Sequence, residues 1–263
     1  MAQIHDLTAL EQAQAVRSKE LSPVEITEHY LERIERLDRE LGAFVTVTAE
    51  RALDQAREQE ARVLREPPED LPPLLGVPVP IKDLNLVKDV PIYFGSATYE
   101  GFVAPVDDAV VERLREAGTI MVGKTNTPEF GLPCYTEPAV CPPARTPWDL
   151  SRSAGGSSGG AAAAVAGGLA PVAHGSDGAG SIRIPASACG LYGIKPSRGR
   201  ISSGPIIPDL AGFSTNGPIS RTVADAAALL DAMAHNNPGD HYWAPPPKLG
   251  SFSAYVGREP GRL

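Results

Sequence analysis

Apolar residues recur every three or four positions near the start of the chain, which is the spacing of an amphipathic helix. Ile26, Tyr30, Ile34 and Leu37 would share one face of such a helix. A further helix is expected over "AERALDQAREQEARVLRE", and the proline-rich stretch "PPEDLPP" would end it. We expect these N-terminal helices to form a layer packed outside the rest of the fold.

Two residue pairs mark where the first helices begin. Thr8 with Glu11, and Ser22 with Glu25, match the capping box, in which each side chain bonds the other's backbone N–H. Pro23 stands at the first helical position, where its missing N–H costs nothing. The capping signals therefore agree with the apolar periodicity.

The middle of the chain alternates short apolar runs with a helical stretch. "LLGVPVPIKDLNLV" predicts a buried strand carrying a Lys-Asp pair, and "TIMVGKTN" predicts the next one. Between them, "DDAVVERLREAG" predicts a helix with Val110, Val111, Leu114 and Ala117 on one face. This order indicates a βαβ unit within an α/β sheet.

The second half of the chain repeats this alternation. "SSGGAAAAVAGGL", "SIRIPASAC" and "SRTVADAAALLDAMA" predict helices, whereas "APVAHGSD" and "LYGIKPSRGRIS" predict strands. The last stretch, "NNPGDHYWAPPPKLGSFSAYVGREPGRL", is rich in proline and weakly periodic. There is no tandem repeat.

Composition narrows the class of protein. The chain has 263 residues, of which 42% are hydrophobic and 21% charged, and its net charge is −8. These values are ordinary for a globular protein, and the chain is long enough for a sizeable core. No basic patch is present, so nucleic-acid binding is not expected.

Cysteine usage and the termini indicate a reducing compartment. Cys134, Cys141 and Cys189 are few and lack metal-ligand spacing, so we expect free thiols with a structural role. The N-terminus lacks the basic and apolar regions of a signal peptide. No apolar run approaches the roughly 20 residues of a membrane helix. We therefore expect a cytoplasmic protein that does not bind membranes.

One apparent phosphate-binding motif is rejected. "GTIMVGKT", Gly118 to Thr125, matches the phosphate-loop pattern, but that loop must follow a strand and precede a helix. Here a helix precedes Gly118 and the interior is strand-like, so we interpret Gly118 as a helix C-cap. The histidines lack ligand spacing and predict no metal site; they are His5, His29, His174, His235 and His241.

The stretch "RSAGGSSGG", residues 152–160, has the composition of a flexible linker but precedes a core-like segment. It places Ser157 among glycines, and Ser181 follows 24 residues later, far enough for a helix and a strand to intervene. Backbone N–H groups near Gly180 can form an oxyanion hole. Lys82, at the end of an apolar strand, is a candidate base if it is desolvated.

"GGSSGG…GSDGAGSIRIPASACGLYGIKPSRGR" resembles the signature stretch of the amidase signature family. "LSPVEITEHYLERIERLD", "GVPVPIKD" and "FGSATYEGFVAPVDDAVVERLREAGTIMVGKTNTPEFG" resemble the N-terminal part of the same enzymes. The resemblance covers nearly all of residues 1–260. It implies a single α/β domain with a mixed central sheet covered by helices on both faces, and no cofactor.

Family members hydrolyse amide bonds with a Ser–Ser–Lys triad. By this resemblance Ser181 is the nucleophile, Ser157 is the bridging serine, held by a cis peptide after Gly156, and Lys82 is the base. To act near neutral pH, the Lys82 amine needs a pKa lowered from about 10.4 toward 7, which burial can supply. The oxyanion hole is expected at Gly178, Ala179, Gly180 and Ser181.

Further residues receive supporting roles. Asp177 and Arg183 are expected to pair and fix the nucleophile loop, and Ser158 to hydrogen-bond within its own loop. Residues 129–138 fall where the family lines its acyl pocket. Leu132 and Cys134 are therefore candidates for substrate contact, with core packing as the alternative.

The sequence departs from the family in two ways. Ala179 replaces a common glycine, and its methyl group is expected to narrow the oxyanion pocket while leaving the N–H. Family members are also considerably longer. We expect a helical layer over 1–66, a catalytic core over 72–235 and a proline-rich tail over 236–263 that leads into a missing C-terminal portion.

The sequence favours an amidase acting on a small-molecule amide, and homodimer formation is left open. Two alternatives remain. One is a catalytically impaired, truncated relative. The other is a protein similar to the A subunit of an amidotransferase, which works within a complex. The sequence does not name the amide.

Overall fold

The computed structural model describes residues 3–206 and 211–261. Its strands are β1 (Phe44–Val47), β2 (Ile81–Lys82), β3 (Gly123–Thr125), β4 (Arg145–Thr146), β5 (Asp149–Ser153), β6 (Val172–Asp177), β7 (Tyr192–Gly193) and β8 (Thr215–Ser220). Its α-helices are α1 (Ala9–Arg17), α2 (Pro23–Leu41), α3 (Ala49–Arg65), α4 (Ala109–Glu116), α5 (Gly159–Ala166), α6 (Arg183–Cys189) and α7 (Val223–Met233).

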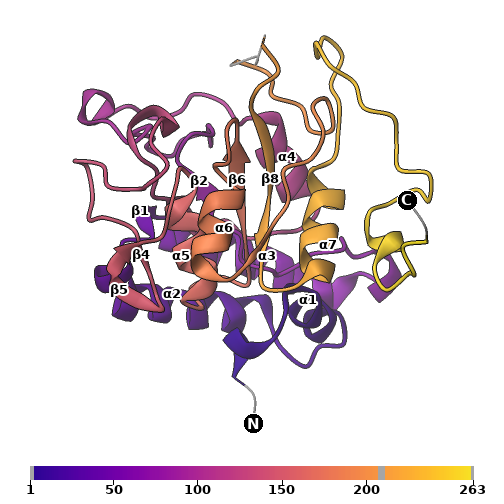
Figure 1. Ribbon diagram of the computed structural model, residues 1–263. Coiled ribbons are helices and arrows are strands. Elements are labelled where there is room, and N and C mark those ends of the chain that lie inside the picture. The colour runs from indigo at the N-terminus through magenta and orange to yellow at the C-terminus, as the bar shows by residue number, and fades with distance from the viewer. Residues whose placement is uncertain (1–2, 207–210, 262–263) are drawn as a thin grey trace.

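Two three-stranded sheets meet edge to edge at the centre of the molecule (Figure 1). In the first, of order β1-β3-β2, β3 pairs antiparallel with β1 and parallel with β2. The second, of order β6-β8-β7, is antiparallel. The N–H of His174 on β6 donates to the carbonyl of Pro80, next to β2, at 3.1 Å. The sheets therefore form one mixed layer, as the resemblance implied.

Helices cover this layer on both faces, which confirms the expected fold class. Side chains of successive strand residues point to opposite faces. Accordingly Ile120 and Val122 pack in a cluster with α2, α5 and α6, whereas Met121 packs with α1, α4 and α7. On β6, Ala173 packs in the first of these clusters and Val172 in the second. In Figure 1 the labels α2 and α5 lie to the left of β6 and β8, and α4 and α7 lie to the right.

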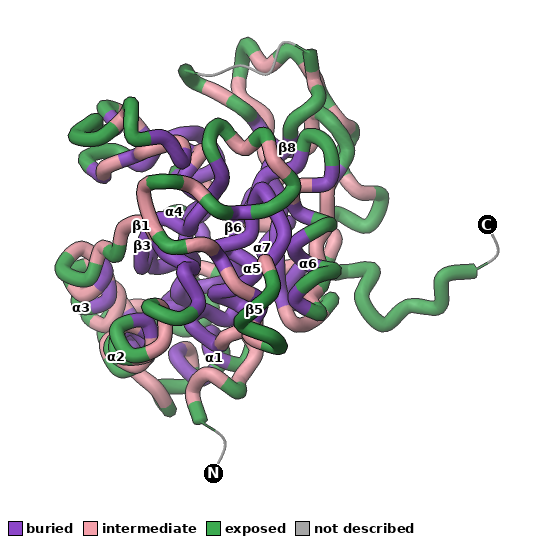
Figure 2. The backbone as a smooth tube through the Cα atoms, turned by 60° about the vertical axis from the view of Figure 1, so that its left-hand side comes forward, coloured by how far each residue is buried: buried purple, intermediate pink, exposed green. Residues whose placement is uncertain are grey.

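Helix α5 is buried along almost its whole length, as its purple trace in Figure 2 shows. Its residues are almost all Gly and Ala, and small side chains allow close backbone approach. A side-chain carbon at Gly160 would lie 2.4 Å from the carbonyl oxygen of Ala43 and from the N of Asn126. One at Gly159 would lie 2.4 Å from the Thr136 hydroxyl. The glycine-rich segment is therefore a packed element.

The predicted helices and their start signals are confirmed. Thr8 and Ser22 form the two expected capping boxes, and Pro23 occupies the first turn of α2. Gly118 follows α4 with a left-handed φ of 84° and leads toward β3, so the phosphate-loop pattern is a helix end followed by a strand.

Three predicted strands are shorter than expected, and the one over 119–126 is reduced to β3 and a bridge at Ile120. Strand pairing over 74–87 is limited to β2 and one bridge at Pro78, and isolated backbone hydrogen bonds, such as Leu74 N–H to the Ala117 carbonyl oxygen, continue the contact outside them. The strand predicted over 191–202 is reduced to β7 and a bridge at Ile201, and Pro196 lies between them.

The sequence analysis also missed four strands. β1 lies inside the segment 1–66 that we expected to be a helical layer, and β4 pairs with β5 as a hairpin. β8 was missed because Gly217 and Pro218 interrupt its apolar pattern. Gly217 is required there, since a side-chain carbon would lie 2.3 Å from the carbonyl oxygen of Ile194.

The proline-rich stretch after α7 contains mostly exposed residues up to 261, and only its end projects from the body, as the green trace near the C-terminus in Figure 2. Its last two residues lie outside the described part. All three cysteines are free thiols; Cys189 is buried. Over the described residues, no helix is long and apolar enough to cross a membrane.

Gly160→Ala is expected to destabilise the protein. Alanine improves helix propensity by about 1 kcal/mol, but overpacking against two backbone atoms costs about 3 kcal/mol or more. We expect the Tm to fall by roughly 4–8 °C. The control is Gly204→Ala, whose added carbon would lie 3.5 Å from the Ser202 hydroxyl. Thermal unfolding measures both; equal stability of Gly160→Ala and wild type would contradict this packing argument.

Candidate active site

Lys82 lies at the end of β2, between β3 and the edge of β6, and its side chain is fully buried. Its ammonium nitrogen Nζ lies 2.8 Å from Ser157 Oγ, 3.1 Å from Ser176 Oγ and 3.2 Å from the Ser176 carbonyl oxygen. Burial lowers the pKa of Lys82 to about 7, against the opposing attraction of Asp177. The amine can therefore be neutral near physiological pH.

Ser157 is held in the turn before α5. The Gly156–Ser157 peptide is cis, as the resemblance implied. The backbone of Cys134 and Tyr135 packs directly on Gly156, where a side-chain carbon would lie within 2.9 Å of it. Gly131 lies over the hydroxyl of Ser157, since a side-chain carbon there would be 3.3 Å from Oγ.

Ser158 connects the serine turn to the segment that carries Ser181. Its N–H donates to the Ser181 carbonyl oxygen at 3.0 Å, and its hydroxyl lies 3.2 Å from the Ser176 carbonyl oxygen. The expected hydrogen bonding of Ser158 is present, and it reaches beyond its own loop. Within the part of the chain that the structure describes, the Ser181 hydroxyl makes no hydrogen bond. The structure therefore brings Lys82 and Ser157 into contact and places Ser181 nearby.

The loop after β6 presents backbone N–H groups next to Ser181. The N–H of Gly180 donates to Asp177 Oδ1 at 2.7 Å, so this one of the expected oxyanion donors is already occupied. Among the described residues, the N–H groups of Gly178, Ala179 and Ser181 have no partner. These three, without Gly180, can face a developing negative charge.

Asp177 organises this loop. Its carboxylate also accepts the N–H of Ile182 at 3.1 Å, and it forms the expected ion pair with Arg183 through two hydrogen bonds of 2.9 and 3.0 Å. Burial alone would raise the pKa of Asp177, but these donors outweigh it and lower the pKa to about 2. The carboxylate thus stays charged and holds the loop.

The two candidate substrate contacts are exposed. The side chain of Leu132 is 82% exposed and Cys134 is also exposed. Both therefore lie outside the core, beside the segment that covers Ser157. The alternative of core packing is wrong for both residues.

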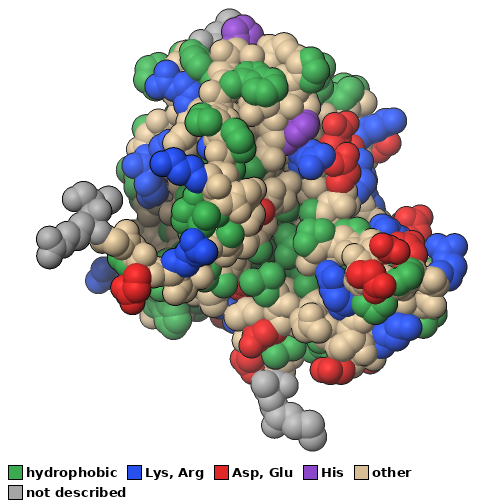
Figure 3. All heavy atoms as spheres, turned by 90° about the vertical axis from the view of Figure 1, so that its right-hand side faces the viewer, with side chains coloured by type: hydrophobic (Ala, Val, Ile, Leu, Met, Phe, Trp, Pro, Cys, Tyr) green, Lys and Arg blue, Asp and Glu red, His purple; other side chains and the backbone are tan. Residues whose placement is uncertain are grey.

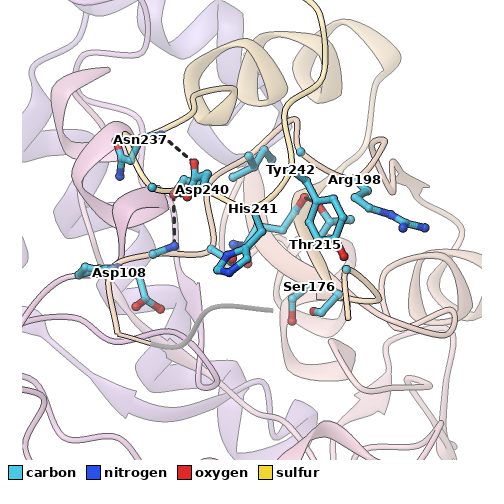
Figure 4. Close-up of a pocket in the computed structure, with 18 of the residues that line it drawn as sticks. Asp108, Ser176, Arg198, Thr215, Asn237, Asp240, His241 and Tyr242 are labelled. Atoms are coloured by element: carbon cyan, nitrogen blue, oxygen red, sulfur yellow. Dashed lines mark hydrogen bonds between the residues drawn. The ribbon is translucent and has the colours of Figure 1, made fainter. Parts of the chain in front are cut away.

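A cavity of about 710 Å³ lies in the same half of the molecule as Lys82, and Ser176 is the residue of its wall that contacts the Lys82 amine (Figure 4). Leu84 also lines it, and Thr215 and Asn216 of β8 form another part of its wall. Figure 4 also shows His241 and Tyr242, from the stretch after α7, at this cavity.

The sequence analysis assigned no role to His174 or Ser176. Both contact Lys82: Ser176 through its hydroxyl, and His174 through ring nitrogen Nδ1, which accepts the Lys82 backbone N–H at 3.3 Å. Their spacing on a predicted strand placed them on one face. This face lies against β2 only because of the order of the strands in the sheets. The local sequence pattern does not predict that order.

On the face in Figure 3, acidic side chains lie mainly to the right and at the bottom, whereas the upper left carries lysine and arginine side chains among hydrophobic ones. Among residues 3–206 and 211–261, no group of three or more His, Cys, Asp or Glu side chains could hold a metal ion.

Comparison with known proteins identifies sequence relatives along almost the whole chain. A family model described as Amidase matches residues 25–263. A "Putative amidase" of Synechocystis sp. is 47% identical over 98% of this chain and 51% of the relative. The A-type subunit of the glutamyl-tRNA(Gln) amidotransferase of Thermobifida fusca is 46% identical over 91% of this chain and 48% of the relative.

Solved structures agree. A substrate complex of 6-aminohexanoate cyclic dimer hydrolase superposes with a TM-score of 0.90 at 39% identity, covering 100% of this chain and 53% of the other. A peptide amidase from Stenotrophomonas maltophilia gives 0.83 at 33% identity, over 98% and 51%. The chain spans about half the length of the relatives it matches.

Asp177→Asn is expected to lower the free energy of unfolding. The drop of the Asp177 pKa from 3.8 to about 2 corresponds to at most roughly 2.5 kcal/mol. Solvent around the half-exposed Arg183 screens the pair, so we expect about 1–2 kcal/mol. Because the pKa is lower in the folded state, this stabilisation is complete above about pH 4 and is lost as the pH falls toward 2. Denaturant unfolding at several pH values measures it.

The matched control is Asp149→Asn, which removes an exposed carboxylate paired with Arg152. Such pairs contribute about 0–1 kcal/mol. If Asp177→Asn cost no more than this control at pH 7, the stabilising role of the Asp177 ion pair would be refuted.

Proposed function

This chain belongs to the amidase family, and we propose that it hydrolyses a carbon–nitrogen amide bond through a serine acyl-enzyme. The observation that carries the proposal is the contact of the buried Lys82 amine with Ser157 Oγ at 2.8 Å. A lysine with a pKa of about 7 is poised to accept a proton at neutral pH. Hydroxyl groups become nucleophiles when such a base is within reach.

The proposed reaction moves protons along the two serines. Neutral Lys82 accepts the proton of Ser157, which accepts the proton of Ser181, while Ser181 Oγ bonds to the carbonyl carbon of the amide. As the C–N bond breaks, the proton returns through Ser157 to the leaving amine. Water then hydrolyses the ester at Ser181 and regenerates its hydroxyl.

The loop after β6 is proposed to stabilise the oxyanion of this reaction. The N–H groups of Gly178, Ala179 and Ser181 are the donors that the Asp177 network leaves available. Each such donor contributes about 3 kcal/mol to lowering the barrier. Asp177 and Arg183 fix the loop and are proposed to act only on its geometry.

A small-molecule amide is the proposed substrate class. The two structural neighbours above are named for a cyclic dimer and for a peptide, so they do not single out one amide. The exposed Leu132 and Cys134 are proposed to contact the acyl part. Homodimer formation and a cytoplasmic location stay predictions.

The similarity to one component of an amidotransferase supports a second candidate, an amidase-like subunit that acts within a complex. In that case activity would depend on partner proteins. Hydrolysis of simple amides by the purified chain alone separates the two functions.

Ser181→Ala is expected to abolish covalent labelling by a fluorophosphonate probe, because the probe reacts with the activated serine oxygen. Intact-protein mass spectrometry of wild type and variant measures the adduct. Ser151→Ala, which removes an exposed serine of the β4–β5 region, should label like wild type. Undiminished labelling of Ser181→Ala would overturn the assignment of the nucleophile.

The labelling rate is expected to increase with pH, with a midpoint near 7. Lys82 accepts a proton only when neutral, and its pKa of about 7 means that the neutral form is lost as the pH falls below that value. The labelling rate of Lys82→Ala should be lower by a factor of about 100 or more. It should also lack the fall in rate below about pH 7, which we call the acid limb of the profile. The exposed Lys248→Ala serves as control. An unchanged limb in Lys82→Ala would exclude Lys82 as the base.

A further inference from the structure

His174 lies where the two sheets meet. The Lys82 N–H points across this seam toward β6, where a strand residue ordinarily finds a backbone carbonyl. Here its acceptor is His174 Nδ1, at 3.3 Å. A backbone hydrogen bond also crosses the seam, from the His174 N–H to the Pro80 carbonyl oxygen at 3.1 Å. A side chain therefore replaces a ladder carbonyl at the residue that carries the amine.

The second ring nitrogen is also occupied. Nε2 of His174 lies 3.0 Å from Asn216 Oδ1 on β8. Because Nδ1 accepts the Lys82 N–H, the ring proton is on Nε2 and is donated to Asn216. An imidazolium would direct an N–H at the N–H of Lys82, so this arrangement requires the neutral ring.

The electrostatic surroundings keep the ring neutral. His174 is fully buried, and burial lowers its pKa to about 3, with smaller contributions in the same direction from Lys82 and Lys124. The hydrogen bond to Asn216 opposes this shift. The ring therefore does not change charge while Lys82 titrates.

His174 and Ser176 hold opposite ends of Lys82. They are two residues apart on β6 and so face the same side. His174 bonds the main chain of Lys82, and Ser176 Oγ bonds its Nζ at 3.1 Å. Six consecutive residue pairs join β6 to β8, so this strand is a firm support.

We propose that His174 is a positioning residue that fixes Lys82 through Nδ1, and that Asn216 selects the ring tautomer that can do so. This inference rests on the proposed function only where it treats Lys82 as the base. Across the described residues the side chain of His174 bonds only Lys82 and Asn216. It makes no hydrogen bond to Ser157 through which to act as a base itself.

The test compares His174→Leu, which removes the acceptor, with His174→Asn, whose amide oxygen can replace Nδ1. His174→Leu should slow fluorophosphonate labelling by about 10- to 100-fold at saturating probe, because a misplacement of about 1 Å can cost about 100-fold in rate. The half-saturating probe concentration should stay within about threefold. His174→Asn should recover most of the rate.

The pH profile supplies a readout that a purely structural role would not change. Once released, the Lys82 amine becomes better solvated, so the acid limb of His174→Leu should move upward from about 7. His29→Leu, a control at another hydrogen-bonded histidine, should leave the limb in place. Rates are taken per folded molecule, from the melting curve.

Asn216→Ala keeps His174 in place and tests the tautomer if His174→Leu does not fold. It should also slow labelling and shift the limb, and ¹⁵N NMR should show loss of the pure Nε2–H form. If every folded variant were labelled at the wild-type rate and the acid limb of its pH profile stayed at the wild-type position, the positioning role of His174 would be overturned. Absence of wild-type labelling would instead overturn the proposed function, while NMR would still test the His174–Lys82 bond.

Discussion

The site depends on withdrawing one lysine amine from water without giving it a carboxylate partner. Two fully buried lysines on neighbouring strands illustrate the difference. Lys124 lies 2.8 Å from the carboxylate of Asp83; burial lowers the Lys124 pKa, and the attraction and hydrogen bond of Asp83 oppose that shift. Lys82 is bonded to two hydroxyls and a carbonyl, and burial lowers its pKa to about 7. The choice of partner, more than the depth of burial, therefore separates a structural lysine from a candidate base.

The glycine-rich turn follows from the same requirement, because a hydroxyl must be brought to a buried amine. Gly156 lets the backbone of 134–135 pack on the turn, and Gly160 lets α5 approach the backbone at Ala43 and Asn126. A side chain at either position would overlap with backbone atoms, which cannot rotate away. Glycine content alone does not distinguish flexibility from close approach. The apolar segment that follows makes the difference here, since α5 is buried along almost its whole length.

Local signals predicted the helices, their caps and the Asp177–Arg183 pair, because each depends on residues close in the chain. The contact of Lys82 with Ser157 was predicted through resemblance to a family, since these residues are distant in sequence. β8 could not be predicted, because Gly217 and Pro218 are typical of a turn although they occupy the middle strand of the second sheet. The roles of His174 and Ser176 depend on β2 lying beside β6. That adjacency is a long-range property of the fold.

β6 connects the separate parts of the candidate site. His174 and Ser176 hold the two ends of Lys82, and Asp177, at the end of the strand, holds the loop with the available N–H groups. The candidate base and the candidate oxyanion donors are thus attached to one six-residue strand, which is paired with β8 over its full length. An error of about 1 Å between such groups can cost a factor of about 100 in rate. Attaching both to a single paired strand limits that error, because the two groups can separate only if the strand itself deforms.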